Sequence, residues 1–183
     1  QGQVPVFAVT NGFFDDPARG GSILPGYRCP RPYEAMFGAL QTSGARWMRF
    51  YEFQWPTSGG RNCDLVLRTA AREADAGVPL VVHGVGTADP GNGTTDPGLT
   101  FQLAGFLLVA TSPHSYFGVS SSYQDDGWVW HAAYDVRYGA PVGPLVVNGS
   151  AYSRELRYSH VHLDCAAGGA GARIVPKSRV PPG

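Results

Sequence analysis

The sequence predicts an α/β protein in which helices cover a parallel sheet. Two observations lead to this fold class. Apolar runs rich in β-branched residues, over residues 4–10 and 78–83, have the composition of strands that are buried on both faces. Segments with helical periodicity, over residues 65–76 and 99–111, alternate with such runs. Strands that alternate with helices along a chain are typical of a parallel sheet.

The first 60 residues supply two of the predicted strands. Residues 4–10 form an apolar strand that ends at Asn11-Gly12, a turn signal. The spacing over residues 33–40 then predicts a short helix. The aromatic stretch 46–55 follows, with strand formers on both sides of its single carboxylate, Glu52. We therefore expect Glu52 near the end of a buried strand, at a surface lined by aromatic rings.

The same order of elements continues from residue 64. Asp64 is the predicted N-cap, and Gly77 the predicted C′ residue, of the helix over 65–76. The next elements are a strand over 78–83, a helix over 99–111 and a serine-rich strand over 116–121.

The character of the chain changes after residue 139. Short alternating segments joined by turns, over residues 142–147, 150–157 and 159–164, predict antiparallel strands. We expect residues 1–176 to form one domain and residues 177–183 to form a flexible tail.

Composition restricts the partners. The chain has 183 residues, with 14 basic and 14 acidic side chains, which argues against nucleic acid or an anionic membrane as the main partner. The longest apolar run is far shorter than the ~20 residues that a membrane span needs. The three cysteines and five histidines show no metal-ligand spacing, so neither a metal nor another cofactor is predicted. A neutral ligand is the better expectation.

Several features favour a secreted protein. Asn92 in Asn-Gly-Thr and Asn148 in Asn-Gly-Ser match the pattern of glycosylation acceptors. Outside the cell, Cys29 and Cys63 would be able to form a bridge that flanks the Glu52 strand, with Cys165 left over. The spacing alone does not decide the pairing.

Motifs spread over residues 4–175 carry a family resemblance. They are Val9-Thr10-Asn11-Gly12-Phe13, Gly44-Ala45-Arg46-Trp47-Met48, Leu103-Ala104-Gly105-Phe106-Leu107-Leu108, Ser115-Tyr116-Phe117, Tyr138-Gly139-Ala140-Pro141-Val142-Gly143, Tyr152-Ser153-Arg154-Glu155-Leu156 and Val161-His162-Leu163-Asp164. In this order they resemble the C-terminal half of the TIM-barrel proteins grouped as hypothetical glycosyl hydrolase family 15. The resemblance implies the later strands of a TIM-like (β/α) barrel, followed by short antiparallel strands. Since such a barrel typically needs about 250 residues, we expect a second chain or a missing N-terminal half to complete it.

The resemblance also implies a function. The protein would be a glycoside hydrolase acting on extracellular carbohydrate, with Glu52 as general acid and a second carboxylate supplied by the absent half. Two alternatives remain for Glu52 as the acid. Glu52 is an ordinary strand-end carboxylate paired with Arg46 or Arg49, or Asp125-Asp126 supplies the acid in its place. The alternative function is that of a non-catalytic carbohydrate-binding or structural subunit of an extracellular assembly.

Residues that would bind the substrate are polar groups at strand ends and aromatic rings that stack on sugars. The candidates are Asn11, Trp55, His83, Tyr123, Trp128 and Trp130. Each has a structural alternative, because an Asn-Gly turn, a satisfied histidine and a packed aromatic loop all occur without a ligand. Arg154-Glu155 is expected to form a structural pair near the last strands.

Overall fold

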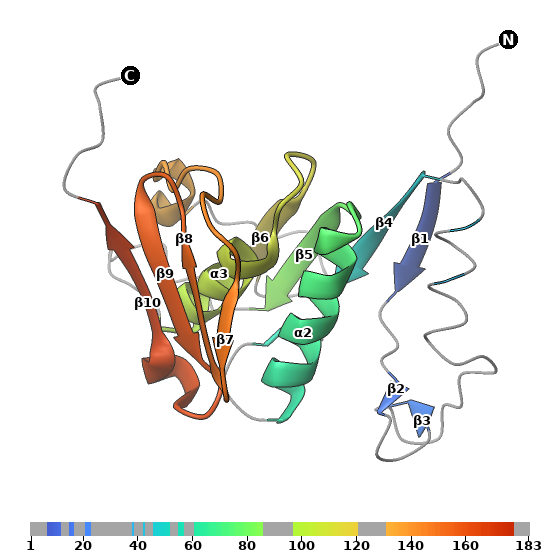
Figure 1. Ribbon diagram of the computed structural model, residues 1–183, viewed down its shortest axis with the longest axis horizontal. Coiled ribbons are helices and arrows are strands. Elements are labelled where there is room, and N and C mark those ends of the chain that lie inside the picture. Colours follow the sequence, from blue (N-terminus) through green and yellow to red (C-terminus); the bar gives the residue numbers. More distant parts are fainter. Residues whose placement is uncertain are drawn as a thin grey trace, which may run out of the picture.

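The computed structural model describes residues 7–11, 15–16, 21–22, 38, 42, 46–51, 55–56, 61–85, 97–120 and 131–177. Within these ranges the chain forms a parallel sheet and an antiparallel sheet, and the helix α3 (Pro97–Val109) lies between them (Figure 1). Two strands of two residues each, β2 (Asp15–Asp16) and β3 (Gly21–Ser22), form an antiparallel pair that belongs to neither sheet.

The parallel sheet contains β1 (Phe7–Asn11), β4 (Arg46–Tyr51), β5 (Leu80–Val85) and β6 (Tyr116–Ser120), in the order β1-β4-β5-β6. Every neighbouring pair is parallel. Parallel pairing agrees with the expectation from the sequence, in which strands alternate with helices. Parallel strands need such crossover connections between them. Closure of these strands into a barrel stays a prediction.

The helix α2 (Arg61–Asp75) follows β4 and packs beside α3. It begins before Asp64, so the prediction that Asp64 is the N-cap is wrong; this residue lies in the first turn. The predicted C-terminal cap is confirmed. Gly77 has φ of +81°, its N–H donates to the Ala74 carbonyl at 2.9 Å, and the Val78 N–H donates to the Glu73 carbonyl at 3.0 Å. These two bonds form a Schellman motif, which favours glycine at the C′ position.

A buried charge network joins α2 to β4. Arg49 and Glu73 are fully buried, with 3.5 Å between Nε of Arg49 and Oε1 of Glu73. The hydroxyl of Tyr51 donates to Oε2 of Glu73 at 2.5 Å. Arg49, one of the two arginines considered as a partner of Glu52, is thus ion-paired to a helix residue. Because buried charges are costly unless paired, this network fixes the position of α2 against the sheet.

The helix α3 is apolar on nearly all sides because both sheets cover it. Phe101, Ala104 and Leu108 are fully buried. At its C-terminal end the Leu108 carbonyl accepts a 2.7 Å hydrogen bond from Nη1 of Arg154, a charge that also suits the negative end of the helix dipole.

The antiparallel sheet has the order β10-β9-β8-β7. Its strands are β7 (Val146–Asn148), β8 (Ala151–Glu155), β9 (Ser159–Asp164) and β10 (Ala172–Pro176), and the short 3-10 helices η2 (Ala132–Asp135) and η3 (Gly168–Gly171) precede β7 and β10. The predicted antiparallel strands are confirmed. Along β9, Val161 and Leu163 are fully buried, whereas His160 and His162 are partly exposed, as strand alternation requires.

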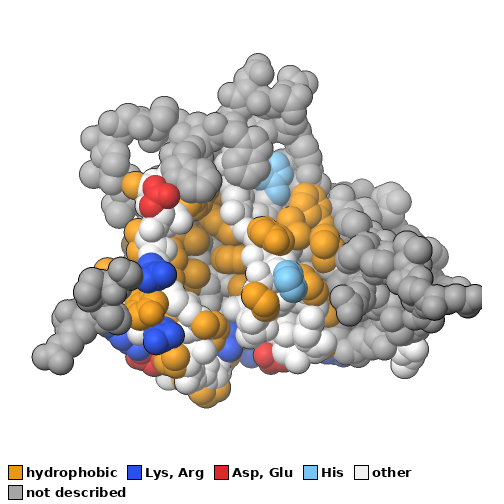
Figure 2. Space-filling model, turned by 90° about the horizontal axis from the view of Figure 1, so that it is seen from above, with side chains coloured by type: hydrophobic (Ala, Val, Ile, Leu, Met, Phe, Trp, Pro, Cys, Tyr) orange, Lys and Arg blue, Asp and Glu red, His pale blue; other side chains and the backbone are white. Residues whose placement is uncertain are grey.

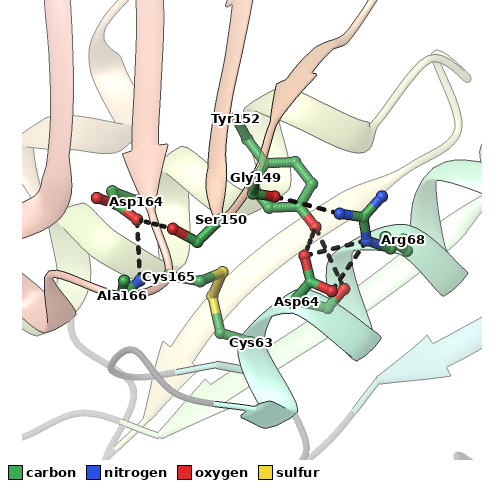
Figure 3. The surroundings of a disulfide bond; sticks show 9 residues. All are labelled: Cys63, Asp64, Arg68, Gly149, Ser150, Tyr152, Asp164, Cys165 and Ala166. Atoms are coloured by element: carbon green, nitrogen blue, oxygen red, sulfur yellow. Dashed lines mark hydrogen bonds and ion pairs between the residues drawn. A yellow bond between two sulfur atoms is a disulfide. The ribbon is translucent and has the colours of Figure 1, made fainter.

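A disulfide joins Cys63, in the first turn of α2, to Cys165, directly after β9, with Cα atoms 5.6 Å apart (Figure 3). The expectation of a Cys29–Cys63 bridge is therefore wrong, and Cys29 lies outside the described residues. The two half-cystines are 102 residues apart in the sequence, and only the packing of the antiparallel sheet beside α2 brings them together. The bridge thus connects the parallel part of the fold to the antiparallel sheet.

Two aspartates next to these cysteines hold the β7–β8 hairpin (Figure 3). Asp64 accepts hydrogen bonds from Tyr152 and, at 2.9 Å, from Arg68, which also donates to the Gly149 carbonyl at 3.2 Å. Although burial raises the pKa of Asp64, these hydrogen bonds outweigh it and hold the pKa below its ordinary value of 3.8. Asp164 accepts a 2.7 Å hydrogen bond from the Ser150 hydroxyl, which lowers its pKa in the same way.

The pair predicted at Arg154-Glu155 does not form. Arg154 points toward α3, while Glu155, on the other face of β8, contacts Nζ of Lys177 at 2.5 Å. Lys177 also donates to the Leu156 carbonyl at 2.6 Å. The first residue of the predicted tail is therefore anchored to the sheet, and residues 178–183 lie outside the described part of the chain.

Candidate functional site

The two faces of the parallel sheet have different surroundings. Leu80, Val82 and Val119 are at most 3% exposed and face the helices. A Cβ built on Gly84 would overlap the Gln102 side chain of α3, which identifies the same face. Because side chains alternate along a strand, the other face carries Met48 and Phe50 of β4, Val81 and His83 of β5, and Tyr116, Gly118 and Ser120 of β6. We call this second surface the distal face.

Apolar side chains and histidines lie together in the view from above the molecule, whereas lysine and arginine side chains gather toward the side of the antiparallel sheet (Figure 2). Tyr116 on the distal face is 61% exposed.

Two polar side chains in the described part of the distal face lie close together. Nε2 of His83 lies 2.7 Å from Oγ of Ser120. His83 is partly buried and Ser120 is 5% exposed. Parallel pairing brings them together, because His83 is the register partner of Gly118, and Ser120 follows two residues later on the same face of β6.

The position of His83 differs from its prediction in one respect. The strand β5 continues to Val85, so His83 lies inside the strand and does not close it. Gly84 looks like a strand terminator in the sequence. In the fold it is an extended residue whose missing side chain allows Gln102 to approach the sheet.

Sequence reasoning missed Ser120. The run Ser120-Ser121-Ser122 has no nucleophile-elbow pattern, and nothing local in it points to a histidine 37 residues away. The usable signal was the position of Ser120 at the end of a predicted strand that neighbours the strand of His83.

The carboxyl ends of the parallel strands lie at one edge of the sheet. They are Asn11 of β1, Tyr51 of β4, Val85 of β5 and Ser120 of β6. Asn11 is the register partner of Phe50, which places it near the end of β4. Glu52 directly follows Tyr51 in the sequence and lies outside the described residues, as do Asn92, Tyr123, Asp125, Asp126, Trp128 and Trp130. The roles suggested for these residues stay predictions.

Trp55 belongs to the core. Its side chain is 2% exposed, and its ring packs edge-on against Tyr51 with 5.3 Å between centroids. The indole N–H donates to the Gln102 carbonyl at 2.9 Å. Burial of both the ring and its polar atom argues against the predicted role of Trp55 as a stacking platform for sugar.

Asn148, in contrast, is accessible. It is exposed at the end of β7, where Gly149, with φ of +60°, begins the tight turn into β8. The hydroxyl of Ser150, the third residue of the glycosylation triplet, is hydrogen-bonded to Asp164.

No group of three or more His, Cys, Asp or Glu side chains is arranged to hold a metal ion in the described part of the chain. None of the helices described has the length and apolar character to cross a bilayer.

Comparison with curated proteins gives no match. The model of one family, described as hypothetical glycosyl hydrolase family 15, matches residues 62–160. This range includes α2 from its second residue, then β5, α3, β6, β7 and β8, with both His83 and Ser120, while Asn11 and Glu52 precede it. Because the match covers more than half of the 183 residues, the chain belongs to the hypothetical glycosyl hydrolase family 15.

Proposed function

We propose that this chain provides the later strands of a TIM-like (β/α) barrel that hydrolyses carbohydrate outside the cell, with Glu52 as the general acid. The family description supports a role of the glycoside-hydrolase type. Substrate and catalytic residue are our proposal.

The observation that carries this proposal is the common edge at which the parallel strands end. Active sites of (β/α) barrels lie at the carboxyl ends of the strands. Tyr51 ends β4 and is the register partner of Val82. The residues that follow these two in the sequence are Glu52 and His83. A carboxylic acid that protonates the leaving-group oxygen would therefore belong to the edge that also carries the His83–Ser120 pair.

The remaining parts of the site would come from further strands. Most glycosidases use two carboxyl groups, separated by about 5–10 Å. A barrel has eight strands, and the described part of the chain supplies a four-stranded parallel sheet. We propose that sequence outside this chain, or a second chain, completes the barrel and provides the second carboxylate.

An extracellular location has two supports. The Cys63–Cys165 bridge is of the kind that persists in oxidising compartments. Asn148 is exposed, as a glycan acceptor must be.

The test uses the complete protein and a panel of oligosaccharides, with release of reducing ends as the readout. Substitution Glu52→Gln should reduce hydrolysis by about 10²–10⁴-fold, the usual contribution of general acid catalysis. Glu155→Gln is the matched control, because Glu155 is an exposed carboxylate on the antiparallel sheet, bound to Lys177. Equal rates for Glu52→Gln and the wild type would end the assignment.

A second function is favoured by one observation. None of the residues that end the four described parallel strands is acidic. We propose as the alternative a non-catalytic carbohydrate-binding or structural subunit of an extracellular assembly. Glycan binding by the wild type without any hydrolysis would select this alternative.

A further inference from the structure

We infer that the outer edge of β6 is the docking surface for a β-strand from outside this chain, the strand that closes the proposed barrel. In this chain the hydroxyl of Tyr134 occupies that edge, and the incoming strand takes its place. The inference rests on the proposed completion of the barrel and does not depend on hydrolysis.

The strand β6 lies at one end of the parallel sheet. In the described part of the chain its neighbour in this sheet is β5, with Gly84 as the register partner of Val119. A strand at the end of a sheet presents a row of N–H and C=O groups on its outer side, and a closed barrel has no such edge because a further strand pairs there. Closure of the barrel therefore requires a new partner for β6.

The backbone of Val119 shows what occupies this edge. Val119 is 3% exposed, and a buried N–H group needs a hydrogen-bond partner. The Val119 N–H donates to the hydroxyl oxygen of Tyr134 at 3.3 Å, so it is not used for pairing with β5. A phenol oxygen accepts a hydrogen bond as a carbonyl oxygen does. The side chain of Tyr134 thus has the position that a carbonyl of the next strand would have.

Aromatic packing in the short helix η2 holds Tyr134 against β6. Its ring lies edge-on to Phe117 of β6, with 6.1 Å between centroids, and edge-on to His131, with 5.4 Å between centroids. The hydroxyl of Tyr138 donates to the Ala133 carbonyl of η2 at 2.9 Å. The helix η2 belongs to neither sheet. Its displacement therefore breaks no strand pairing.

A strand would satisfy this edge more completely than Tyr134 does. One hydroxyl accepts one N–H group, whereas a paired strand bonds a row of backbone groups along β6. Because all described pairs in this sheet are parallel, the incoming strand should run parallel to β6. It would also cover part of Tyr116, which begins β6 and is 61% exposed.

Amide hydrogen exchange of Val119, measured by NMR with ¹⁵N-labelled valine, tests the contact in this 183-residue chain. Tyr134→Phe removes only the hydroxyl and should speed exchange of the Val119 amide about 2–10-fold, the effect of one lost hydrogen bond. Tyr116→Phe is the matched control, because it removes the same atom from an exposed ring on the same strand, and it should leave the rate unchanged. The amide of Val82 in β5 is the internal reference and should exchange equally in all three proteins.

The same measurement in the complete protein tests the docking surface. There the Val119 amide should exchange more slowly than in this chain, and Tyr134→Phe should leave its rate unchanged, because a strand carbonyl binds the N–H. The inference is overturned if Tyr134→Phe speeds the exchange equally in both proteins, or if it has no effect in this chain. The predicted exchange pattern without any hydrolysis would support the docking surface and would refute only the enzymatic proposal.

Discussion

Removal of the Cys63–Cys165 bridge should cost a large part of the stability of this protein. The bridge closes a loop whose ends are 102 residues apart. In the chain-entropy model, a cross-link that closes a loop of roughly 100 residues stabilises the fold by about 4.7 kcal/mol, and measured values are commonly about 2–4 kcal/mol. We therefore expect the double substitution Cys63→Ala and Cys165→Ala to lower the free energy of unfolding by about 3–5 kcal/mol. The free energy of unfolding of a typical domain is only about 5–15 kcal/mol.

Urea denaturation followed by circular dichroism measures this loss. Dithiothreitol should shift the midpoint of the wild type to that of the double variant and should leave the double variant unchanged. Cys29→Ala is the matched control and should behave as the wild type. Peptide mapping without reduction should recover Cys63 linked to Cys165. A bridge that contains Cys29, or equal loss of stability in Cys29→Ala, would refute the reasoning.

Other contacts yield further predictions. Gly84→Ala should destabilise the fold by about 1–3 kcal/mol in urea titration, because the added methyl overlaps Gln102; if Gln102→Ala in the same chain recovers none of this loss, the overlap is not the cause. Glu73→Gln should lower the free energy of unfolding by about 3–5 kcal/mol in the same assay, because it leaves the buried charge of Arg49 without its carboxylate. A decrease of less than about 1 kcal/mol would contradict this network. Acid should destabilise the wild type below about pH 4. The folded-state pKa of Asp64 lies below 3.8, so its contribution is complete above that value and is lost as the pH falls through the lowered pKa. The slope of stability against pH in this range should be smaller in Asp64→Asn, and identical slopes would exclude the Asp64 contribution.

Much of the fold follows from local sequence patterns. The apolar runs predicted the strands β5 and β6, because burial on two faces leaves a continuous apolar signal. Helical spacing predicted the helices α2 and α3. Alternation predicted β9, where Val161 and Leu163 face the core. Gly77 was predictable as a helix cap because a positive φ favours glycine.

Features that depend on distant contacts were not predictable. The pairing of Cys63 with Cys165 requires the antiparallel sheet to pack beside α2, and no local pattern encodes that packing. Trp55 directly precedes a loop in the sequence, a position where a surface ring is expected. In the structure the Gln102 carbonyl provides a hydrogen-bond partner for its indole N–H inside the core. The contact of His83 with Ser120 depends on the register between two strands, which the sequence of either strand leaves open.

The role of Glu52 can be tested most directly through the leaving group of the substrate. A general acid protonates the departing oxygen, and a leaving group that is stable as an anion does not need that proton. The measurement is kcat/KM for two aryl glycosides of the same sugar, one with a phenyl and one with a 2,4-dinitrophenyl leaving group, in the wild type and in Glu52→Gln. We predict that Glu52→Gln lowers the rate with the phenyl glycoside by about 10²–10⁴-fold and changes the rate with the dinitrophenyl glycoside by less than about tenfold. Equal losses with both substrates, or no loss with either, would contradict the assignment of Glu52 as the general acid.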